Sequence, residues 1–184
     1  MANFKLSVDD GCASDVRVAE LSKKYGIETV FYWPVEWHSL AYDKGYEPLS
    51  LWNADKIAKD FEIGSHGLTH VYLTQVDRDT AIREISDSQW LLKRMFSQEI
   101  KKFCAPRGYM NDELTEIALT QYESVRLTKG DGLVHIHPNS GANGNMHWID
   151  YAATIDVKEF WGHSHEFDRY NMWDDIEAYF KEHA

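Results

Sequence analysis

The chain has 184 residues, of which 43% are hydrophobic and 27% are charged, and its formal net charge at pH 7 is −11. This length suits one sizeable core but not two ordinary domains, so we expect a single domain over residues 1–184. The acidic balance, without a dense basic patch, argues against a nucleic-acid partner or an anionic membrane partner.

The first half of the chain alternates strand-like and helix-like segments. Runs rich in β-branched and aromatic residues predict three strands, at 4–8, 27–32 and 61–64. Between them, one helix is expected to start at a cap formed by Ser14 or Asp15 and to stop at Gly26, and another to start at Asn53. The aromatic segment 33–51, with two prolines, reads as a long loop.

The second half continues the same alternation. Apolar residues at helical spacing predict a helix over 77–96, and Asn111 is expected to cap another helix. The remaining expected elements are strands at 102–104 and near 123–127, 147–149 and 157–161, and a closing helix at 173–181. Residues 140–145 read as a Gly/Asn loop. This alternation predicts a parallel α/β fold with its chemistry at the strand C-termini.

Two motifs follow the ends of expected strands. His66 and His70, four residues apart, can turn both imidazoles toward one metal ion. Asp9 and Asp10 end the first strand, and Gly11 follows them. One carboxylate with two imidazoles is a frequent ligand set for a catalytic divalent metal, which leaves the second carboxylate free to act as a base. Taken singly, each motif also fits a plainer interpretation, as surface histidines or as an Asp–Gly turn.

Together, the two stretches resemble the polysaccharide deacetylases, the NodB-homology or carbohydrate esterase family 4 group. Residues 7–11 match the first motif of that family, with Val8 in place of the aromatic residue. Residues 62–70 match its second motif, with Gly67 at the usual Ser or Thr. The resemblance implies a distorted (β/α)7-type barrel, which strand counting alone does not distinguish from a doubly wound sheet.

The resemblance also implies a mechanism. The expected ligands of one divalent metal ion are Asp10, His66 and His70. Zinc is the expected ion, although cobalt, nickel or manganese would also suit the site. Asp9 would take the proton from the attacking water, and His163, after the last expected strand, would protonate the leaving amine. His165 competes for that role, and a third imidazole here is alternatively a metal ligand.

Residues 103–109 lie where the family carries its third motif, and they match it only in part. Cys104 stands at the position of the arginine that holds the catalytic aspartate in the family. Arg107 is a candidate to reach that carboxylate from the other side, or to serve the oxyanion through its main chain; a surface arginine in a Pro–Gly turn is the alternative. The residues expected to contact substrate are Pro106, Gly108, Tyr109 and Trp148.

Other polar residues have no secure counterpart in the family. His135 and His137 alternate on an extended segment, so both rings point the same way, and a second metal there is not favoured. Glu166 or Asp168 is expected to tune the pKa of His163 as a negative neighbour.

The leading expectation is therefore a metal-dependent N-deacetylase with an N-acetylated carbohydrate as substrate. One alternative is a hydrolase of another non-peptide C–N bond, as in a small or cyclic amide. The other is a metal-containing carbohydrate-binding module without catalysis. The sequence shows no signal peptide, which makes a cytoplasmic location the default, although a trimmed chain would also fit a secreted or cell-wall protein. The oligomeric state is left open.

Overall fold

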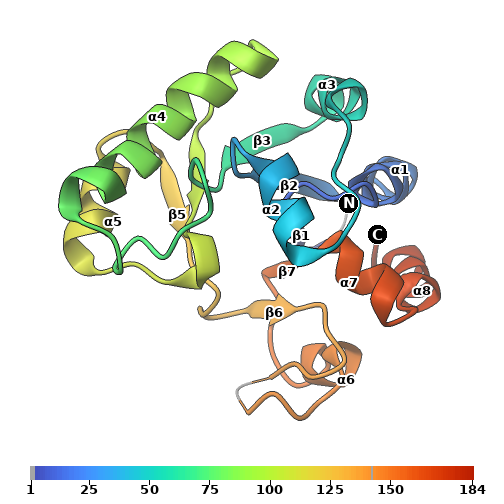
Figure 1. Ribbon diagram of the computed structural model, residues 1–184. Coiled ribbons are helices and arrows are strands. Elements are labelled where there is room, and N and C mark those ends of the chain that lie inside the picture. The colour runs from blue at the N-terminus through green and yellow to red at the C-terminus, as the bar shows by residue number, and fades with distance from the viewer. Residues whose placement is uncertain (1–2, 142) are drawn as a thin grey trace.

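The computed structural model describes residues 3–141 and 143–184, and its centre is a curved sheet with helices outside it (Figure 1). All strand pairs in the sheet are parallel, in the order β5-β4-β3-β2-β1-β7-β6. The strands are β1 (Lys5–Asp9), β2 (Glu28–Trp33), β3 (Glu62–Ser65), β4 (Lys102–Cys104), β5 (Ser124–Arg126), β6 (Leu133–His135) and β7 (Glu159–Gly162). Because β5 and β6 are the two unpaired ends of this order, the sheet is a half-barrel. The predicted distorted (β/α)7-type fold is confirmed.

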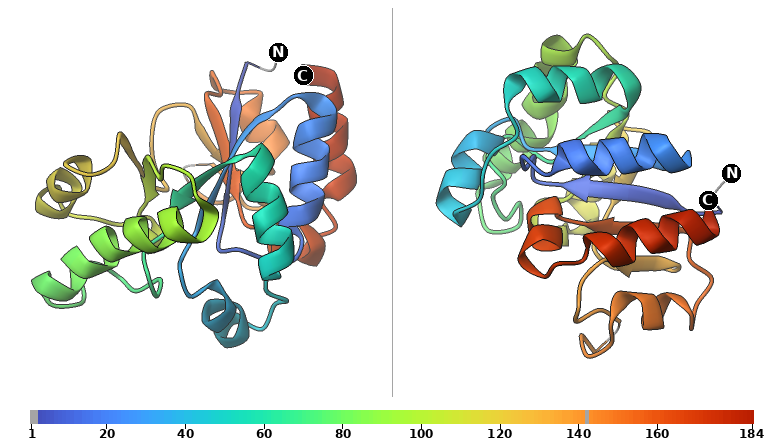
Figure 2. Two further views of the ribbon diagram at one scale, coloured as in Figure 1. Left: turned by 90° about the horizontal axis from the view of Figure 1, so that it is seen from above. Right: turned by 90° about the vertical axis from the view of Figure 1, so that its right-hand side faces the viewer.

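The helices surround the outer side of this sheet, except α2, which lies in front of β1 and β2 in Figure 1. They are α1 (Asp15–Tyr25), α2 (Trp37–Lys44), α3 (Leu51–Asp60), α4 (Arg78–Phe96), α5 (Asp112–Leu119), α6 (Trp148–Ala152), α7 (Ser164–Arg169) and α8 (Trp173–His183), with a short 3-10 turn η1 (Pro106–Gly108). Helix α1 packs against α3 and α8, and Figure 2 shows α1 and α8 on either side of β1. Among the helices described, none is both long enough and apolar enough to cross a bilayer.

An aromatic cluster fixes α2 over the ends of the central strands. Trp33, the last residue of β2, is fully buried. Its ring centroid lies 5.9 Å from that of Trp37 in α2 and 5.4 Å from that of Phe96 at the end of α4. The Trp37 indole N–H also donates to the carbonyl of Leu49, at 2.8 Å. The helix is therefore anchored by buried rings at its start, and its last turn extends over the sheet edge.

Several helix boundaries agree with the cap residues expected from the sequence. Helix α1 ends before Gly26, which has a left-handed backbone (φ 66°). The Asn111 side chain, an expected cap, accepts from Leu114 N at the start of α5. At the start of α4, where no cap was predicted, the Asp77 side chain accepts from Thr80 N.

Other elements differ from the expectation. The predicted loop 33–51 contains α2, whose N-cap Glu36 makes no side-chain capping bond and so gives no start signal. The cap of α3 is Ser50, which accepts from Asn53 N, rather than Asn53 itself. Residues 147–149, predicted as a strand, begin α6. The strand β6 and the helix α7 were not predicted, and within the expected loop 140–145, Ala142 lies outside the described residues.

Candidate metal centre and active site

The candidate catalytic and metal-binding side chains gather where the strands end. Parallel strands carry their C-termini to the same edge of a sheet, so residues distant in sequence meet there. The polar residues that end a strand or directly follow one are Asp9, Asp10, Ser65, His66, Cys104, Arg126, His135 and His163. The half-barrel therefore places every predicted catalytic or metal-binding side chain except Arg107 and His70 directly at this edge, and those two follow within a few residues.

Asp10, His66 and His70 form a compact buried set. The Asp10 Oδ1 atom lies 3.5 Å from His66 Nε2 and 3.2 Å from His70 Nε2. Ligand bonds of about 2.0–2.2 Å in a tetrahedral site put neighbouring donor atoms roughly 3.3 Å apart, which matches these distances. Asp10 Oδ1 is also buried without a hydrogen-bond partner in the described part of the chain. The three residues therefore fit a divalent cation.

Neighbouring groups prepare the two imidazoles for this role. His66 Nδ1 lies 2.8 Å from the carbonyl oxygen of Cys104, so Nδ1 donates there and Nε2 faces Asp10. Burial lowers the pKa of His70 to about 4, which keeps its ring neutral at pH 7. Burial alone would raise the pKa of Asp10, but the histidines around it, His163 among them, hold it well below its usual range.

The turn between the two histidines is held by Glu84, a residue that the sequence reasoning missed. Glu84 is buried in α4 and accepts from Leu68 N at 2.7 Å, from Thr69 N at 3.0 Å and from the Thr69 hydroxyl at 2.6 Å. A Cβ on Gly67 (φ 79°) would lie 3.0 Å from Glu84 Oε2, which explains glycine at the usual Ser or Thr of the motif. The available signal was a carboxylate within the apolar face of this helix, between Ala81 and Ile85.

Asp9, the predicted base, is held by an arginine from another strand. Arg126 Nη2 contacts both carboxylate oxygens of Asp9, at 2.6 Å from Oδ2. Burial would raise the pKa of Asp9, but the guanidinium of Arg126, together with His66 and His163, lowers it. Cys104 pairs in register with Arg126 on the neighbouring strand, and its Sγ lies 3.9 Å from Asp9 Oδ2. The role of the arginine that the family motif carries at position 104 is thus taken by Arg126, on the neighbouring strand β5.

Arg107 does not reach Asp9. Its guanidinium lies over the ring of Tyr72, 5.3 Å from the centroid. Its backbone has a left-handed conformation (φ 61°) within η1, directly after the buried Pro106. The part of Arg107 that stays a candidate for the reaction is therefore the main chain.

His163 is the imidazole beside the metal-ligand set. Its Nε2 lies 3.8 Å from Asp10 Oδ2, and its Nδ1 lies 2.9 Å from Glu166 Oε2. Burial would lower the pKa of His163, but the charges of Asp10 and Glu166 raise it above its ordinary value. The competing His165 instead lies 3.3 Å from the Cys12 sulfur and stacks on Tyr46. Of the two expected acidic neighbours of His163, Glu166 makes the contact.

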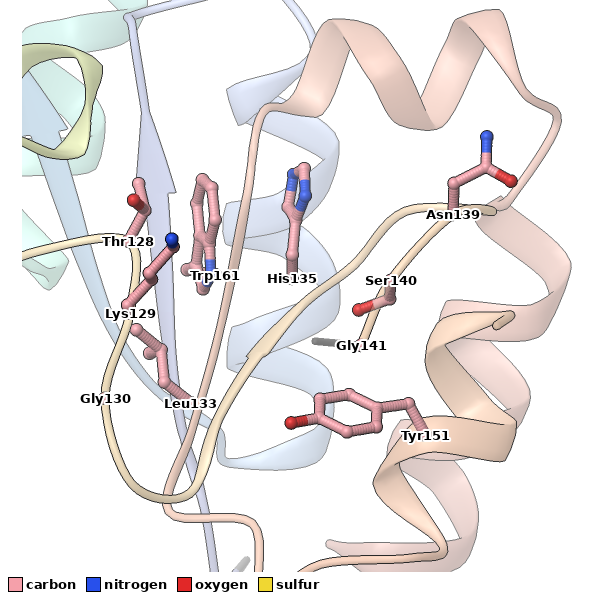
Figure 3. A pocket seen from close by; sticks show the side chains of 10 residues that line it. All are labelled: Thr128, Lys129, Gly130, Leu133, His135, Asn139, Ser140, Gly141, Tyr151 and Trp161. Carbon is pink, nitrogen blue, oxygen red and sulfur yellow. The ribbon is translucent and has the colours of Figure 1, made fainter. Parts of the chain in front are cut away.

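The last residue of α2 also reaches the site. The Lys44 ammonium lies 3.0 Å from Asp10 Oδ2, the oxygen turned away from His66 and His70. Lys44 lines two cavities, one of about 640 Å³ that includes His70 and Arg107, and one of about 570 Å³ that includes Tyr46 and His165. A third cavity, of about 540 Å³, lies beside Trp161 and His135 (Figure 3).

The residues expected to bind substrate are divided by the structure. The segment after β4, at the sheet edge where the strands end, contains Pro106, Gly108 and Tyr109. The Tyr109 side chain is exposed. Trp148 is fully buried, with its ring 5.5 Å from that of Phe160 and 5.1 Å from that of Tyr179. This burial contradicts the expected role of Trp148, because a ring inside the core has no face for a sugar.

Comparison with known proteins agrees with the observed fold. The family described as polysaccharide deacetylase matches residues 4–123. A family 4 carbohydrate esterase pseudoenzyme from Bacillus anthracis has a similar fold, with a TM-score of 0.70 and 16% identity over 98% of this chain and 61% of that chain. A peptidoglycan N-acetylglucosamine deacetylase gives a TM-score of 0.71 and 16% identity over 98% and 82%.

A third similar structure is a family 4 carbohydrate esterase from Streptomyces lividans, with a TM-score of 0.62 and 15% identity over 89% of this chain and 79% of that chain. This chain spans only about six tenths of the length of the pseudoenzyme. No curated protein matches the sequence. At these identities, the similar structures establish the fold.

Proposed function

Because the chain belongs to the polysaccharide deacetylase family, we propose that it hydrolyses the N-acetyl groups of an N-acetylated carbohydrate in a metal-dependent reaction. The observation that carries this proposal is the pairing of Asp9 with Arg126 beside the Asp10, His66 and His70 set. A module that only binds carbohydrate has no need of a second, arginine-held carboxylate at its metal site.

A divalent cation on Asp10, His66 and His70, with zinc the expected ion, would polarise the acetamide carbonyl and lower the pKa of a bound water toward neutrality. Asp9 accepts the proton of the attacking water, since Arg126 keeps this carboxylate ionised and fixed. The Arg107 main-chain N–H, after Pro106, donates to the developing oxyanion.

The departing amine needs a proton, because an amide anion is a very poor leaving group. His163 supplies that proton from Nε2, the atom that faces Asp10 at 3.8 Å, while Glu166 holds Nδ1. The charge that Glu166 and Asp10 favour on this ring is the one that a general acid requires. The products are acetate and a free amino sugar. The cavities on both sides of Lys44 give room for further sugar units next to the one that reacts.

Acetate release is the first property to measure, since the similar structures include a pseudoenzyme. Protein stripped with a chelator and reloaded with zinc or cobalt is assayed on a panel of N-acetylated oligosaccharides. We expect release only after reloading. If the metal is bound but no substrate yields acetate, the hydrolysis of small cyclic amides is assayed next. Silence there too would leave a metal-containing binding module.

Asp9→Asn tests the assignment of the base. An amide cannot accept the proton of the attacking water, so we expect kcat to fall by about 10²–10⁴-fold, the usual contribution of general acid–base catalysis. The metal content, measured by elemental analysis after dialysis, should stay at one ion per chain because Asp10, His66 and His70 are unchanged. An Asp9→Asn protein that keeps its activity would show that another group is the base.

A further inference from the structure

A second group of possible metal ligands lies on the far side of His163 from Asp10. His135 ends β6, His163 follows β7 and Glu166 lies in α7. Glu166 Oε2 is 2.9 Å from His163 Nδ1 and 3.4 Å from His135 Nε2, and one donor atom from each residue lies within 4.8 Å of the others. Three elements thus bring two imidazole nitrogens and one carboxylate oxygen together.

The His135 ring is fixed in place, yet the nitrogen that it turns to this group is unsatisfied. The His135 ring stacks on that of Trp161 (Figure 3), with centroids 3.9 Å apart, and on that of His137, with centroids 5.1 Å apart. Its Nε2 atom is buried and has no hydrogen-bond partner in the described part of the chain. Burial lowers the pKa of His135, so the ring is neutral at pH 7 and offers a lone pair.

We propose that His135, His163 and Glu166 form a second site for a divalent transition-metal cation such as zinc, adjacent to the centre at Asp10, His66 and His70. Two imidazoles and one carboxylate are a ligand set that zinc accepts. Tetrahedral bonds of about 2.0–2.1 Å put the donor atoms roughly 3.3 Å apart, so small side-chain movements complete the geometry. His135 also lines the cavity of about 540 Å³, from which water can fill the fourth position.

Occupation of this second site inhibits the enzyme. A cation on His163 Nδ1 stands where the proton of the charged ring would be, so the ring can no longer act as the acid. This consequence rests on the proposed function, whereas the binding itself does not. Because the first cation lies nearby and repels the second, we expect the second equivalent to bind at least tenfold more weakly than the first.

Metal stoichiometry tests the binding directly. Stripped protein is dialysed against increasing free Zn²⁺ and the bound metal is measured by elemental analysis. We expect two equivalents in the unmodified protein and one in His135→Gln. The matched control is His137→Gln, on the same segment, whose Nδ1 accepts from Asn139 N and which is outside the group. It should keep both equivalents.

Two outcomes of the dialysis experiment overturn the proposal. One is a single equivalent of bound zinc in the unmodified protein, and the other is two equivalents of bound zinc in His135→Gln. The retained first equivalent shows that His135→Gln is folded. As a second measurement, the visible absorption of Co²⁺ should develop in two steps in the unmodified protein and in one step in His135→Gln, and identical one-step titrations contradict a second site.

Measurements of acetate release at increasing zinc distinguish a failure of the second metal site from a failure of the proposed function. Acetate release should rise with the first equivalent of zinc and fall at least tenfold with the second. The His135→Gln variant should show the same rise but no fall. Inhibition of equal size in His135→Gln overturns the inhibitory role. If no protein releases acetate at any zinc concentration, the proposed function fails while the stoichiometry still decides the second site.

Discussion

Three residues picked out by the sequence motifs share an uncommon backbone. Asp10 (φ 80°), His70 (φ 62°) and Arg107 (φ 61°) are among five non-glycine residues with positive φ in the described part of the chain. Such conformations cost on the order of 1–3 kcal/mol each and persist where the surroundings impose them. They occur here at two metal-ligand candidates and at the turn whose main chain is proposed to bind the oxyanion. The strain therefore falls on residues whose orientation matters most for the proposed reaction.

Arg126 is a positioning residue, because it acts on the reaction through its contact with both carboxylate oxygens of Asp9. We expect Arg126→Ala to lower kcat by roughly 10²-fold or more, because the buried Asp9 then loses the charge that keeps it ionised and oriented. Zinc content and KM should change little, since Arg126 touches neither the metal ligands nor the cavities. Steady-state kinetics with elemental analysis separates these effects from a general loss of folding.

Relocating the arginine provides the control. Cys104 pairs in register with Arg126, and its sulfur lies 3.9 Å from Asp9 Oδ2, so a guanidinium from position 104 can enter the space that Arg126→Ala opens. The double variant Cys104→Arg/Arg126→Ala should recover activity relative to Arg126→Ala. If the double variant is no better, and Arg126→Lys is as active as the unmodified enzyme, the planar contact to both Asp9 oxygens is not what matters.

At the scale of elements, α4 supports the proposed metal centre as well as the core. We expect Glu84→Gln to weaken zinc binding by roughly 10–100-fold, because the amide cannot accept all three hydrogen bonds of the turn that carries His70. The thermal midpoint of the metal-free protein should also fall. Zinc affinity is measured by competition with a chelator.

Asp87→Asn, at an exposed position of the same helix, is the matched control and should change neither property. Equal zinc affinity in Glu84→Gln and Asp87→Asn would mean that the turn holds its shape without the carboxylate.

The elements differ in how far the sequence predicts them. Helix α4 was located from the helical spacing of its apolar residues and α5 from its cap at Asn111, both of which are local signals. Helix α2 has no capping bond and is fixed by the contacts of Trp37 with distant rings, which no local pattern carries. The same holds within the site. The motifs of Asp10 and of His66 and His70 can be recognised in the sequence alone. The contact of Arg126 with Asp9 depends on the pairing register of β4 and β5, which the sequence does not show.

At the scale of the whole molecule, one buried carboxylate joins three elements behind the active edge. Asp15, the first residue of α1, accepts from the Trp33 indole of β2 at 2.9 Å and from the Ser164 hydroxyl of α7 at 2.6 Å. Ser164 directly follows His163, so this contact links the position of the proposed general acid to the core. Asp15 is fully buried and near the charges of Asp10 and Asp9.

These surroundings make Asp15 a source of pH-dependent stability. Burial, reinforced by the nearby carboxylates, raises its pKa from the ordinary value of 3.8 to about 7. Because the folded state holds the Asp15 proton more tightly than the unfolded state, the contribution of Asp15 to the free energy of unfolding is highest below about pH 4 and is lost as the pH rises to about 7. A shift of about three pKa units corresponds to at most about 4 kcal/mol.

Asp15→Asn should remove this dependence. The asparagine is neutral at every pH, can accept from the Trp33 indole and can donate to the Ser164 hydroxyl, so it reproduces the protonated acid. We expect the unmodified protein to lose stability relative to Asp15→Asn between about pH 4 and pH 7, measured by urea unfolding of both proteins without metal. Glu20→Gln, at an exposed position of α1, should follow the unmodified protein. Parallel stability curves for the unmodified protein and Asp15→Asn would mean that Asp15 is ionised in the fold, with its two donors outweighing its burial.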